Sequence, residues 1–438
     1  MEINDVLLNK EEYKHTSGFS KSDIFFWALV IFALCILVAL CLLPEGTSVF
    51  SQKFWIAILS WPTVVSGFVG LMLIRHRQVD AAEKKHAFEE NRAAAMAVAS
   101  RSLALLGGAY RYTTSPDGDS IDAIADGSVV LTARKRNGNN HEAEGKGAPL
   151  MARWFETFSA YPRPNREIGF ADFDRQNHLT KWLLEELLER LSPHIAAMPP
   201  QMKCVAHLYF GNRVNTRRNL AHWENVASHV LLRLFPVVYQ NTDAEGLLKL
   251  DRWLDDAISH NGDEARLIVA IQLNDFHREP FPAEGSAEAA SAILLMPDAL
   301  AEKHKLQKVA TVHRPVTSSI ETHTDAIKLA MRVAAVSGKR ISNIWQTGIL
   351  PAQRGSLSIL TRKAEVLAPA IDLDRAVGST GIAAPWFAVA CAQASLCQNG
   401  GAQMVTAGGG DKVSTLVLKP ARKAVGSVKT VDGRIVRG

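Results

Sequence analysis

Residues Leu267–Met296, which read LIVAIQLNDFHREPFPAEGSAEAASAILLM, decide the fold class of this chain of 438 residues. The stretch begins with the apolar run Leu267–Leu273 and ends with a second one, Ala292–Met296. Short runs of this composition, bounded by turn residues, are typical of strands that are buried on both faces. The turn sequence Ala283-Glu284-Gly285-Ser286 lies between them. The stretch therefore predicts two core strands joined by a polar loop.

The same alternation continues outward from this stretch. Short β-branched runs alternate with longer segments of helical period, which is the pattern of a layered α/β domain. We therefore assign residues 107–420 to one α/β domain, with the polar loop Asn137–Gly147 at its surface. The predicted strands are Ser128–Arg134, Val205–Phe210, Leu267–Leu273, Ala292–Met296, Lys308–His313, Ser342–Gln346, Gln403–Ala407 and Thr415–Lys419, and the predicted helices are His178–Leu191, Leu220–Leu234, Leu247–Ser259, Thr322–Val336 and Pro385–Cys397.

Two segments after the deciding stretch carry a family resemblance. Ala376–Leu396 reads AVGSTGIAAPWFAVACAQASL, a glycine-containing loop followed by a helix of small residues, and Val405–Asp411 reads VTAGGGD before the strand TLVLK. Together with the helix Leu247–Ser259 and the deciding stretch, their order and spacing resemble the condensing enzymes of the thiolase and ketoacyl synthase fold. The resemblance implies a thiolase-like layered α/β domain made of two pseudo-related halves.

The residues that such an enzyme would use are missing at the matching positions. A condensing enzyme needs a nucleophilic cysteine at a helix N-terminus and two polar side chains, usually histidines, that manage the thioester oxyanion. The segment before the helix Leu247–Ser259 reads YQNTDAEGLLKL and holds no cysteine. The positions that match the two histidines carry Gln346 or Thr347 and Ser379. We therefore predict no catalytic residue, no cofactor and no metal ion, and hence a protein that is not an enzyme.

Cysteines and histidines elsewhere give no second candidate site. The cysteines of the predicted domain have no activating base beside them in the sequence, and the histidines between residues 304 and 323 lack the spacing of paired metal ligands. Gly408–Gly410 is followed by no Gly-Lys-Ser/Thr sequence, so it predicts a turn rather than a phosphate loop. The acids of helix Leu247–Ser259 predict a solvated face. The residues concerned are Cys204, Cys391, Cys397, His304, His313, His323, Asp251, Asp255 and Asp256.

The N-terminal part of the chain has a different character. Ile24–Leu43 and Phe54–Ile74 carry no charged residue, and each reaches the roughly 20 apolar residues that cross a bilayer. Basic residues flank the pair on both outer sides, and this asymmetry predicts that both ends lie in the cytoplasm. We therefore predict a cytoplasmic N-terminus over residues 1–23, a transmembrane helical hairpin over 24–74 and a helical linker over 75–106. Two buried helices of a soluble core are the alternative.

The net charge of +5 is concentrated at one end of the chain. Residues 421–438 form a basic C-terminal tail, and the remainder of the chain is nearly neutral. Because no predicted folded region combines a basic face with interleaved aromatic residues, we expect no nucleic-acid partner. The charged residues of the tail are Arg422, Lys423, Lys429, Arg434 and Arg437, with the single acid Asp432.

A two-span anchor joined to a thiolase-like domain without catalytic residues resembles the type VI secretion lipase adaptor family of Gram-negative bacteria. That resemblance implies a non-catalytic adaptor or chaperone, held in the bacterial inner membrane with its main domain in the cytoplasm. Its partners would be a phospholipase effector, the secretion spike protein and inner-membrane lipid, and a homodimer is left open. The alternatives are a membrane-anchored thiolase- or ketosynthase-like acyltransferase that uses unconventional residues, and a membrane scaffold that binds through its hairpin.

Overall fold

The computed structural model describes residues 21–41, 52–55, 60–115, 118–134, 150–155, 168–231, 233, 235–240, 245–259, 264–275 and 282–421. The chain divides into two compact units, Met1–Val98 and Ala99–Gly438. The second is called the globular unit from here on. The predicted surface loop Asn137–Gly147 and residues 422–438 of the predicted tail lie outside the described residues.

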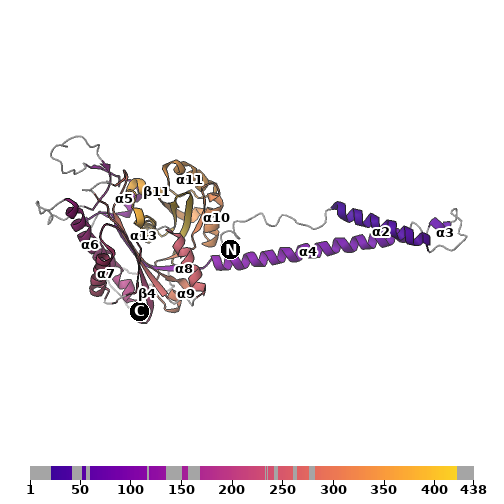
Figure 1. Ribbon diagram of the computed structural model, residues 1–438, viewed down its shortest axis with the longest axis horizontal. Coiled ribbons are helices and arrows are strands. Elements are labelled where there is room, and N and C mark those ends of the chain that lie inside the picture. Colours follow the sequence, from indigo (N-terminus) through magenta and orange to yellow (C-terminus); the bar gives the residue numbers. More distant parts are fainter. Residues whose placement is uncertain are drawn as a thin grey trace, which may run out of the picture. The chain divides into compact units, whose positions relative to one another are not determined.

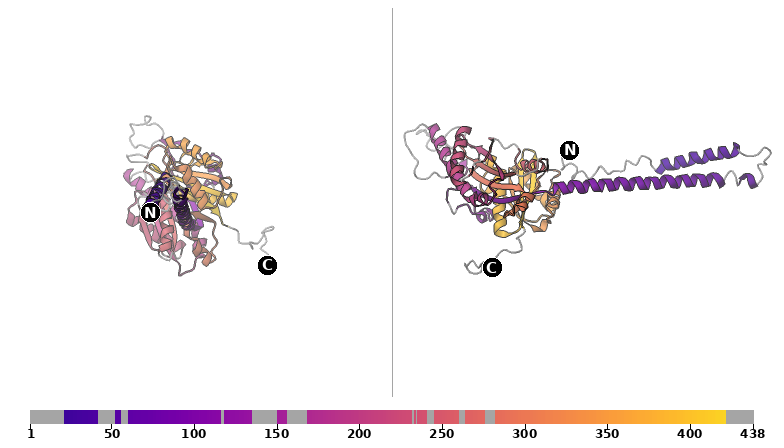
Figure 2. Two further views of the ribbon diagram at one scale, coloured as in Figure 1. Left: turned by 90° about the vertical axis from the view of Figure 1, so that its right-hand side faces the viewer. Right: turned by 90° about the horizontal axis from the view of Figure 1, so that it is seen from below.

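The first unit consists of helices. They are α2 (Lys21–Cys41), the short α3 (Gln52–Trp55) and the 39-residue α4 (Trp61–Ala99). The helices α2 and α4 lie alongside each other (Figures 1 and 2) and expose large apolar side chains such as Leu34 and Leu71. Among the helices of the described residues, none meets the length and apolarity that a bilayer span requires. The transmembrane hairpin predicted over 24–74 therefore has no support among these helices.

The linker predicted as helical over 75–106 ends earlier than expected. The helix α4 stops at Ala99, and the strand β1 (Ser102–Arg111) begins where the last part of the linker was predicted. Residues Leu103–Leu106 are all buried in this strand. Because β1 pairs with strands on both edges and is covered on both faces, it lacks the alternation of polar and apolar residues that marks a half-buried strand. Its apolar run therefore looks like a continuation of the preceding helix.

The first half of the globular unit builds one mixed sheet. Its strands have the spatial order β5-β4-β6-β7-β1, in which β4, β5 and β6 are parallel and β7 is antiparallel to both of its neighbours. Besides β1 the elements are α6 (Ile168–Ala196), β4 (Lys203–Gly211), α7 (Thr216–Val230), β5 (Val237–Gln240), α8 (Leu248–Ser259), β6 (Glu264–Gln272) and β7 (Ala289–Pro297).

The second half repeats the same topology. Its strands have the order β11-β10-β12-β13-β8, with β10 parallel to both β11 and β12, and β13 antiparallel to both of its neighbours on that path. The elements are β8 (Ala310–His313), β9 (Val316–Ser319), α10 (His323–Val333), β10 (Ile341–Thr347), α11 (Pro351–Lys363), β11 (Ala370–Asp372), α13 (Ala384–Asn399), β12 (Ala402–Gly409) and β13 (Lys412–Pro420).

Short elements connect these repeats. They are α5 (Ile121–Ala125), β2 (Ala133–Arg134), β3 (Leu150–Met151), α9 (Asp298–Lys303), α12 (Leu373–Ala376) and the 3-10 turns Gly338–Arg340 and Gly381–Ala383.

The two halves enclose a central helical layer. Figure 1 shows α6 and α7 on one outer side of the globular unit, α10 and α11 on the other, and α13 between them. Apolar side chains of α8 and α13 pack together in this layer, where the rings of Trp253 and Trp386 stack with centroids 6.4 Å apart. The helix α13 is buried on nearly every face, since Trp386, Phe387 and Cys391 are all 0% exposed. A second apolar cluster fills the space between α6, α7 and the first sheet.

The two halves are joined by backbone hydrogen bonds and by ion pairs. The strand β1 pairs with β8, so the strands of the two halves form one continuous sheet. The buried Arg314, which follows β8, donates through Nη1 to Asp251 and through Nη2 to Asp255, at 2.7 Å, on α8. These two acids were predicted to belong to a solvated face. They lie one helical turn apart, and Arg314 reaches both because such residues share one side of a helix.

Most predicted elements are confirmed. The majority are longer than predicted, whereas β8, α8 and α10 are shorter and α7 begins four residues earlier at the same length. Of the strand predicted over Ser128–Arg134, only Ala133–Arg134 is a strand. The strands β1, β5, β9 and β11 and the helix α11 were not predicted. The turn predicted at Gly408–Gly410 is confirmed as the connection between β12 and β13, with Gly410 at a φ of +68°.

Candidate functional site

The start of α8 is the position at which a condensing enzyme would carry its nucleophile. Glu245, Gly246 and Leu247 form the turn that leads into the helix, while residues 241–244 lie outside the described residues. Gly246 has a φ of +50°, and a Cβ atom built on it would stand 3.9 Å from Cγ of Pro385 at the start of α13. The N-termini of the two central helices therefore converge at this point.

Ser379 lies just before α13 and is exposed. Its backbone N–H donates to the carbonyl oxygen of Gly285 at 2.7 Å, and its own carbonyl accepts from the N–H of Ala287 at 2.8 Å. Two segments that the sequence singled out separately, the Glu-Gly-Ser turn and the loop before α13, are thus bonded to each other. This pairing fixes the Ser379 backbone while its side chain faces outward.

The side chain of Gln272, at the end of β6, holds the start of α13 in place. Its Oε1 accepts the backbone N–H of Ile382 at 3.2 Å, and its Nε2 donates to Oδ1 of Asn274 at 3.0 Å. A Cβ atom on Gly211 or Gly381 would come within 2.2 or 2.4 Å of Oε1, so only glycine leaves room for this amide. We call Gly246, Gln272 and the segment Ser379–Pro385 the helix-start site.

Gln346 and Thr347 occupy opposite faces of β10. Successive side chains of a strand point to opposite faces. Trp345, two residues before Thr347, belongs to the central cluster. Thr347 therefore shares the inner face with Trp345, and Gln346 is directed to the outer face of the sheet. Of these two positions, only Thr347 is placed where it could serve a site in the central layer.

The hydroxyl of Thr347 is already engaged by an acid. Its Oγ1 donates to Oδ1 of Asp374 at 2.9 Å, and the N–H of Gly348 donates to Oδ2 of the same carboxylate at 2.7 Å. Burial raises the pKa of Asp374, and the two hydrogen bonds oppose that rise in part. The end of β10 is thereby tied to α12, and this hydroxyl serves a structural bond rather than a ligand.

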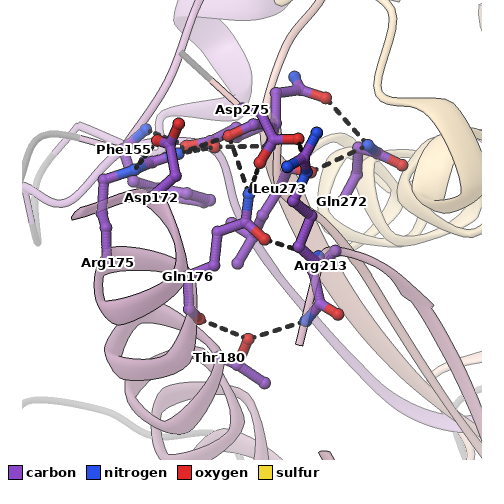
Figure 3. A network of polar contacts seen from close by, with 12 residues as sticks. Phe155, Asp172, Arg175, Gln176, Thr180, Arg213, Gln272, Leu273 and Asp275 are labelled. Carbon is purple, nitrogen blue, oxygen red and sulfur yellow. Dashed lines mark hydrogen bonds and ion pairs between the residues drawn. The ribbon is translucent and has the colours of Figure 1, made fainter. Parts of the chain in front are cut away.

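A network of buried charges supports the same end of the first sheet (Figure 3). The carboxylate of Glu288, at the beginning of the β7 segment, is 0% exposed and accepts four hydrogen bonds. Two come from Arg175 at 2.6 and 3.0 Å, one from the N–H of Phe155 at 2.9 Å and one from the N–H of Asn274 at 2.8 Å. A buried carboxylate with this many donors is fully satisfied, and it fixes the loop that follows β6.

The network continues to the surface through Gln176. Its Nε2 donates to Oδ1 of Asp275 at 2.9 Å, and its Oε1 accepts the N–H of Arg213 at 2.7 Å. Arg213 in turn pairs with Asp275 through its Nε. Because Arg213 follows β4 and Asp275 follows β6, these contacts lock together the carboxyl ends of two parallel strands, where open α/β sheets usually carry their sites.

Neither glutamate of the segment Glu284–Glu288 was assigned a role from the sequence. Glu284 is exposed, whereas Glu288 carries the buried network. A signal was available, since Glu288 is the single charged residue of the run Ala287–Met296. A lone carboxylate in an otherwise apolar strand must be paired if it is buried.

The cysteines of the globular unit are poorly placed for nucleophilic chemistry. Burial raises the pKa of Cys204 to about 12 and raises that of the fully buried Cys391 well above its usual range. Cys397 is exposed but lies at the opposite end of α13 from the helix-start site, roughly 20 Å along the helix axis. Within the described residues, no group of three or more potential metal ligands comes together.

Comparison with known proteins gives a structural likeness alone. No model of a protein family matches the chain, and no curated protein is similar to it in sequence. The ketosynthase from module 1 of the bacillaene synthase of Bacillus amyloliquefaciens is 12% identical, with a TM-score of 0.50, over 75% of this chain and 75% of its own. A ketosynthase domain of oxazolomycin synthesis from Streptomyces albus is 12% identical, with a TM-score of 0.50, over 75% of this chain and 77% of its own.

These neighbours correct the functional expectation drawn from the sequence. The resemblance to type VI secretion lipase adaptors implied a non-catalytic carrier of a phospholipase effector, whereas the similar structures are ketosynthases. The adaptor assignment is therefore wrong, and the alternative of a thiolase- or ketosynthase-like protein agrees better with the neighbours. At 12% identity the likeness establishes the fold and not the activity. The globular unit has the thiolase-like, mixed α/β fold of ketosynthases.

Proposed function

We propose that the globular unit is a ketosynthase-like acyltransferase that accepts acyl groups from thioesters at the helix-start site. The observation that carries the proposal is the exposed Ser379 in the loop before α13, next to the 3-10 turn Gly381–Ala383 that packs on β4 and β6. The N-terminus of α8 approaches the other end of this segment, at Pro385, through Gly246. Helix N-termini favour negative charge, which is the charge that develops on a thioester oxygen during acyl transfer.

The chemistry would use an oxygen rather than a sulfur nucleophile. The Ser379 oxygen attacks the thioester carbonyl, a C–O bond forms and the C–S bond breaks. The serine proton leaves with the departing thiol, so the step is balanced without a further reagent. The thiols of Cys204 and Cys391 take no part because burial keeps them protonated.

The proposal is tested with acyl-coenzyme A thioesters of two to eight carbons and the full chain in detergent. Intact-mass spectrometry should show one acyl adduct, which Ser379→Ala abolishes. Ser379→Trp should block the site, and Ser356→Trp is its matched control because Ser356 is also exposed and lies on α11. A chain that forms no adduct, or an adduct that survives Ser379→Ala, would overturn the proposal.

We propose in addition that α2 and the apolar first part of α4 anchor the protein in the bacterial inner membrane. Exposed apolar side chains such as Phe26, Leu37 and Phe68 follow one another along these helices and support the proposal, because a large exposed apolar surface marks a site of contact with a membrane or a partner. Basic residues on both outer sides would keep both ends in the cytoplasm.

Thiol labelling tests this anchor. In vesicles with the cytoplasmic face outward, a membrane-impermeant maleimide should label the exposed Cys397 at once and label Cys35 and Cys41 only after detergent is added. Equal labelling of all three without detergent would exclude a membrane location for these helices.

A further inference from the structure

A chain of hydroxyl groups around one histidine lies in the second half of the globular unit, apart from the helix-start site. Ser318 Oγ is 2.9 Å from Nδ1 of His323, and Nε2 of His323 is 3.0 Å from Oγ1 of Thr415. Thr415 Oγ1 is in turn 3.2 Å from Oγ1 of Thr406. The chain connects the strands β9, β13 and β12 with the first residue of α10.

One end of this series of hydrogen-bonded side chains is partly exposed to solvent. His323 and Thr415 are 0% exposed and Thr406 is 2% exposed, whereas Ser318 is only half-buried. Ser318 lies on β9, a four-residue strand that pairs with β13 along one edge. A reagent from solvent can therefore meet the Ser318 oxygen but not the imidazole behind it.

The imidazole is in the form that can accept a proton. Burial lowers the pKa of His323 to about 4, so the ring is neutral at pH 7 and carries one N–H and one free lone pair. If Nε2–H donates to Thr415, the Thr415 hydroxyl donates onward to Thr406, and Nδ1 is left to accept the Ser318 proton. In this arrangement the hydrogen bonds all run the same way, from Ser318 through His323 and Thr415 to Thr406.

Neighbouring hydroxyl groups on the same strand lack this partner. Thr317 Oγ1 pairs with Ser414 Oγ at 2.7 Å, and Ser319 Oγ pairs with Thr322 Oγ1 at 3.3 Å. Ser318 is distinguished from both because its partner is an imidazole, whereas Ser319 also hydrogen-bonds the carboxylate of the exposed Glu321. A hydroxyl, a base within hydrogen-bond distance and a third group that orients the base are the three parts of an activated nucleophile.

We infer that Ser318 is a nucleophilic serine, activated by His323 and positioned through Thr415, that takes an acyl group from activated esters. The serine oxygen attacks the carbonyl carbon, the C–O bond forms, the bond to the leaving alcohol breaks, and the serine proton passes to Nδ1 of His323 and then to the leaving group. Because a hydroxyl rather than a carboxylate orients the base, the imidazolium gains little stabilisation. Ser318 should thus react faster than an ordinary serine but slower than the serine of a hydrolase with an acidic third member.

The probe for this inference is an alkyl fluorophosphonate, with which an O–P bond forms and fluoride leaves. The full chain in detergent is labelled and the modified peptide is identified by mass spectrometry. Activation by a positioned base contributes on the order of 10²-fold or more, so Ser318 should be labelled at least about tenfold faster than Ser319. Ser318→Ala should abolish this label, whereas Ser319→Ala should leave its rate unchanged.

A second variant tests the positioning role without changing the buried His323. Thr415→Val removes the orienting hydroxyl at nearly constant volume, and a roughly tenfold slower label at Ser318 in a folded protein would support the positioning role. A Ser318 label no faster than that of Ser319, or one unchanged by Thr415→Val, would overturn the inference. Ser379→Ala should not affect the label, so this result is independent of the acyltransferase proposal.

Discussion

The two halves of the globular unit share one strand order but stabilise the ends of their strands differently. In the first half, buried charges do this, with the ion pair of Glu288 and Arg175 at the centre of the network. In the second half, the ends of β10 and β12 are held by a close backbone contact between Gly348 and Gly408 and by the hydrogen bonds that Asp374 accepts from Thr347 and Gly348. The apolar pattern can therefore be repeated while the polar contacts at the strand ends differ, which places the two halves under different constraints.

The charged contact of the first half should be the most sensitive to change. Glu288→Gln removes the carboxylate closest to Arg175 and leaves this buried cation facing the more distant Asp172, at 3.9 Å. Breaking a buried ion pair in this way costs about 3–5 kcal/mol of unfolding free energy. Urea unfolding followed by tryptophan fluorescence would measure this loss.

The matched control for this prediction is Glu284→Gln, in the same turn but exposed, which should change stability by less than about 0.5 kcal/mol. Equal losses for Glu288→Gln and Glu284→Gln would contradict the assignment of the network to Glu288.

The backbone contact of the second half should respond to a single methyl group. Gly348 has a φ of +66°, and a Cβ atom on it would stand 2.7 Å from the carbonyl oxygen of Gly408. We expect Gly348→Ala to lower the unfolding free energy by about 1–3 kcal/mol, since the backbone must shift or remain strained.

Gly355 provides the control within the same half. It lies in α11, and nothing stands within 4 Å of a Cβ atom built on it. Gly355→Ala should therefore raise the unfolding free energy by about 0.5–1 kcal/mol, because alanine is the better helix former. Two variants of opposite sign in one assay would show that the Gly348 effect is local; a Gly348→Ala protein of unchanged stability would refute the close contact.

Local pattern was sufficient to predict the strands whose residues are uniformly apolar, such as β6 and β7, and the amphipathic helices. It failed for β1, whose apolar run follows helix-forming residues with no glycine or proline between them, and for β5, which has only four residues at the sheet edge. Pairing across the chain, such as Arg314 with Asp251 and Asp255, cannot be read from local spacing because the partners are about 60 residues apart.

The candidate site was predicted in part. The positions of Ser379 and of the α8 start follow from motif order, and the structure places Ser379 in the loop that leads into α13 through the 3-10 turn Gly381–Ala383. The choice between Gln346 and Thr347 was open in the sequence, although alternation along β10 would have resolved it once Trp345 was assigned to the inner face. Gln272 could not be found in this way, because its role depends on Gly211 and Gly381, which approach it only in the folded chain.

The smallest predicted effect concerns Asp374 and appears as a dependence on pH. Burial raises the pKa of this carboxyl in the folded protein above its unfolded value near 4. Between these two pKa values the folded state binds more protons than the unfolded state, so stability falls as pH rises through that window and is level on either side. Asp374→Asn does not titrate and keeps one oxygen to accept a hydrogen bond. The unfolding free energy of the native chain minus that of Asp374→Asn should therefore decrease with rising pH in urea titrations.

Asp126 is the control with the opposite sign. The N–H of Ser128 donates to its carboxylate at 2.9 Å and lowers the pKa of Asp126. The native chain should consequently gain stability relative to Asp126→Asn as pH rises through the range in which this acid ionises. If both differences had the same slope, a change in overall charge would explain them, and the buried environment of Asp374 would not. Opposite slopes would instead show that burial resists the ionisation of Asp374 in the second half, whereas the first half pairs its buried Glu288 with Arg175.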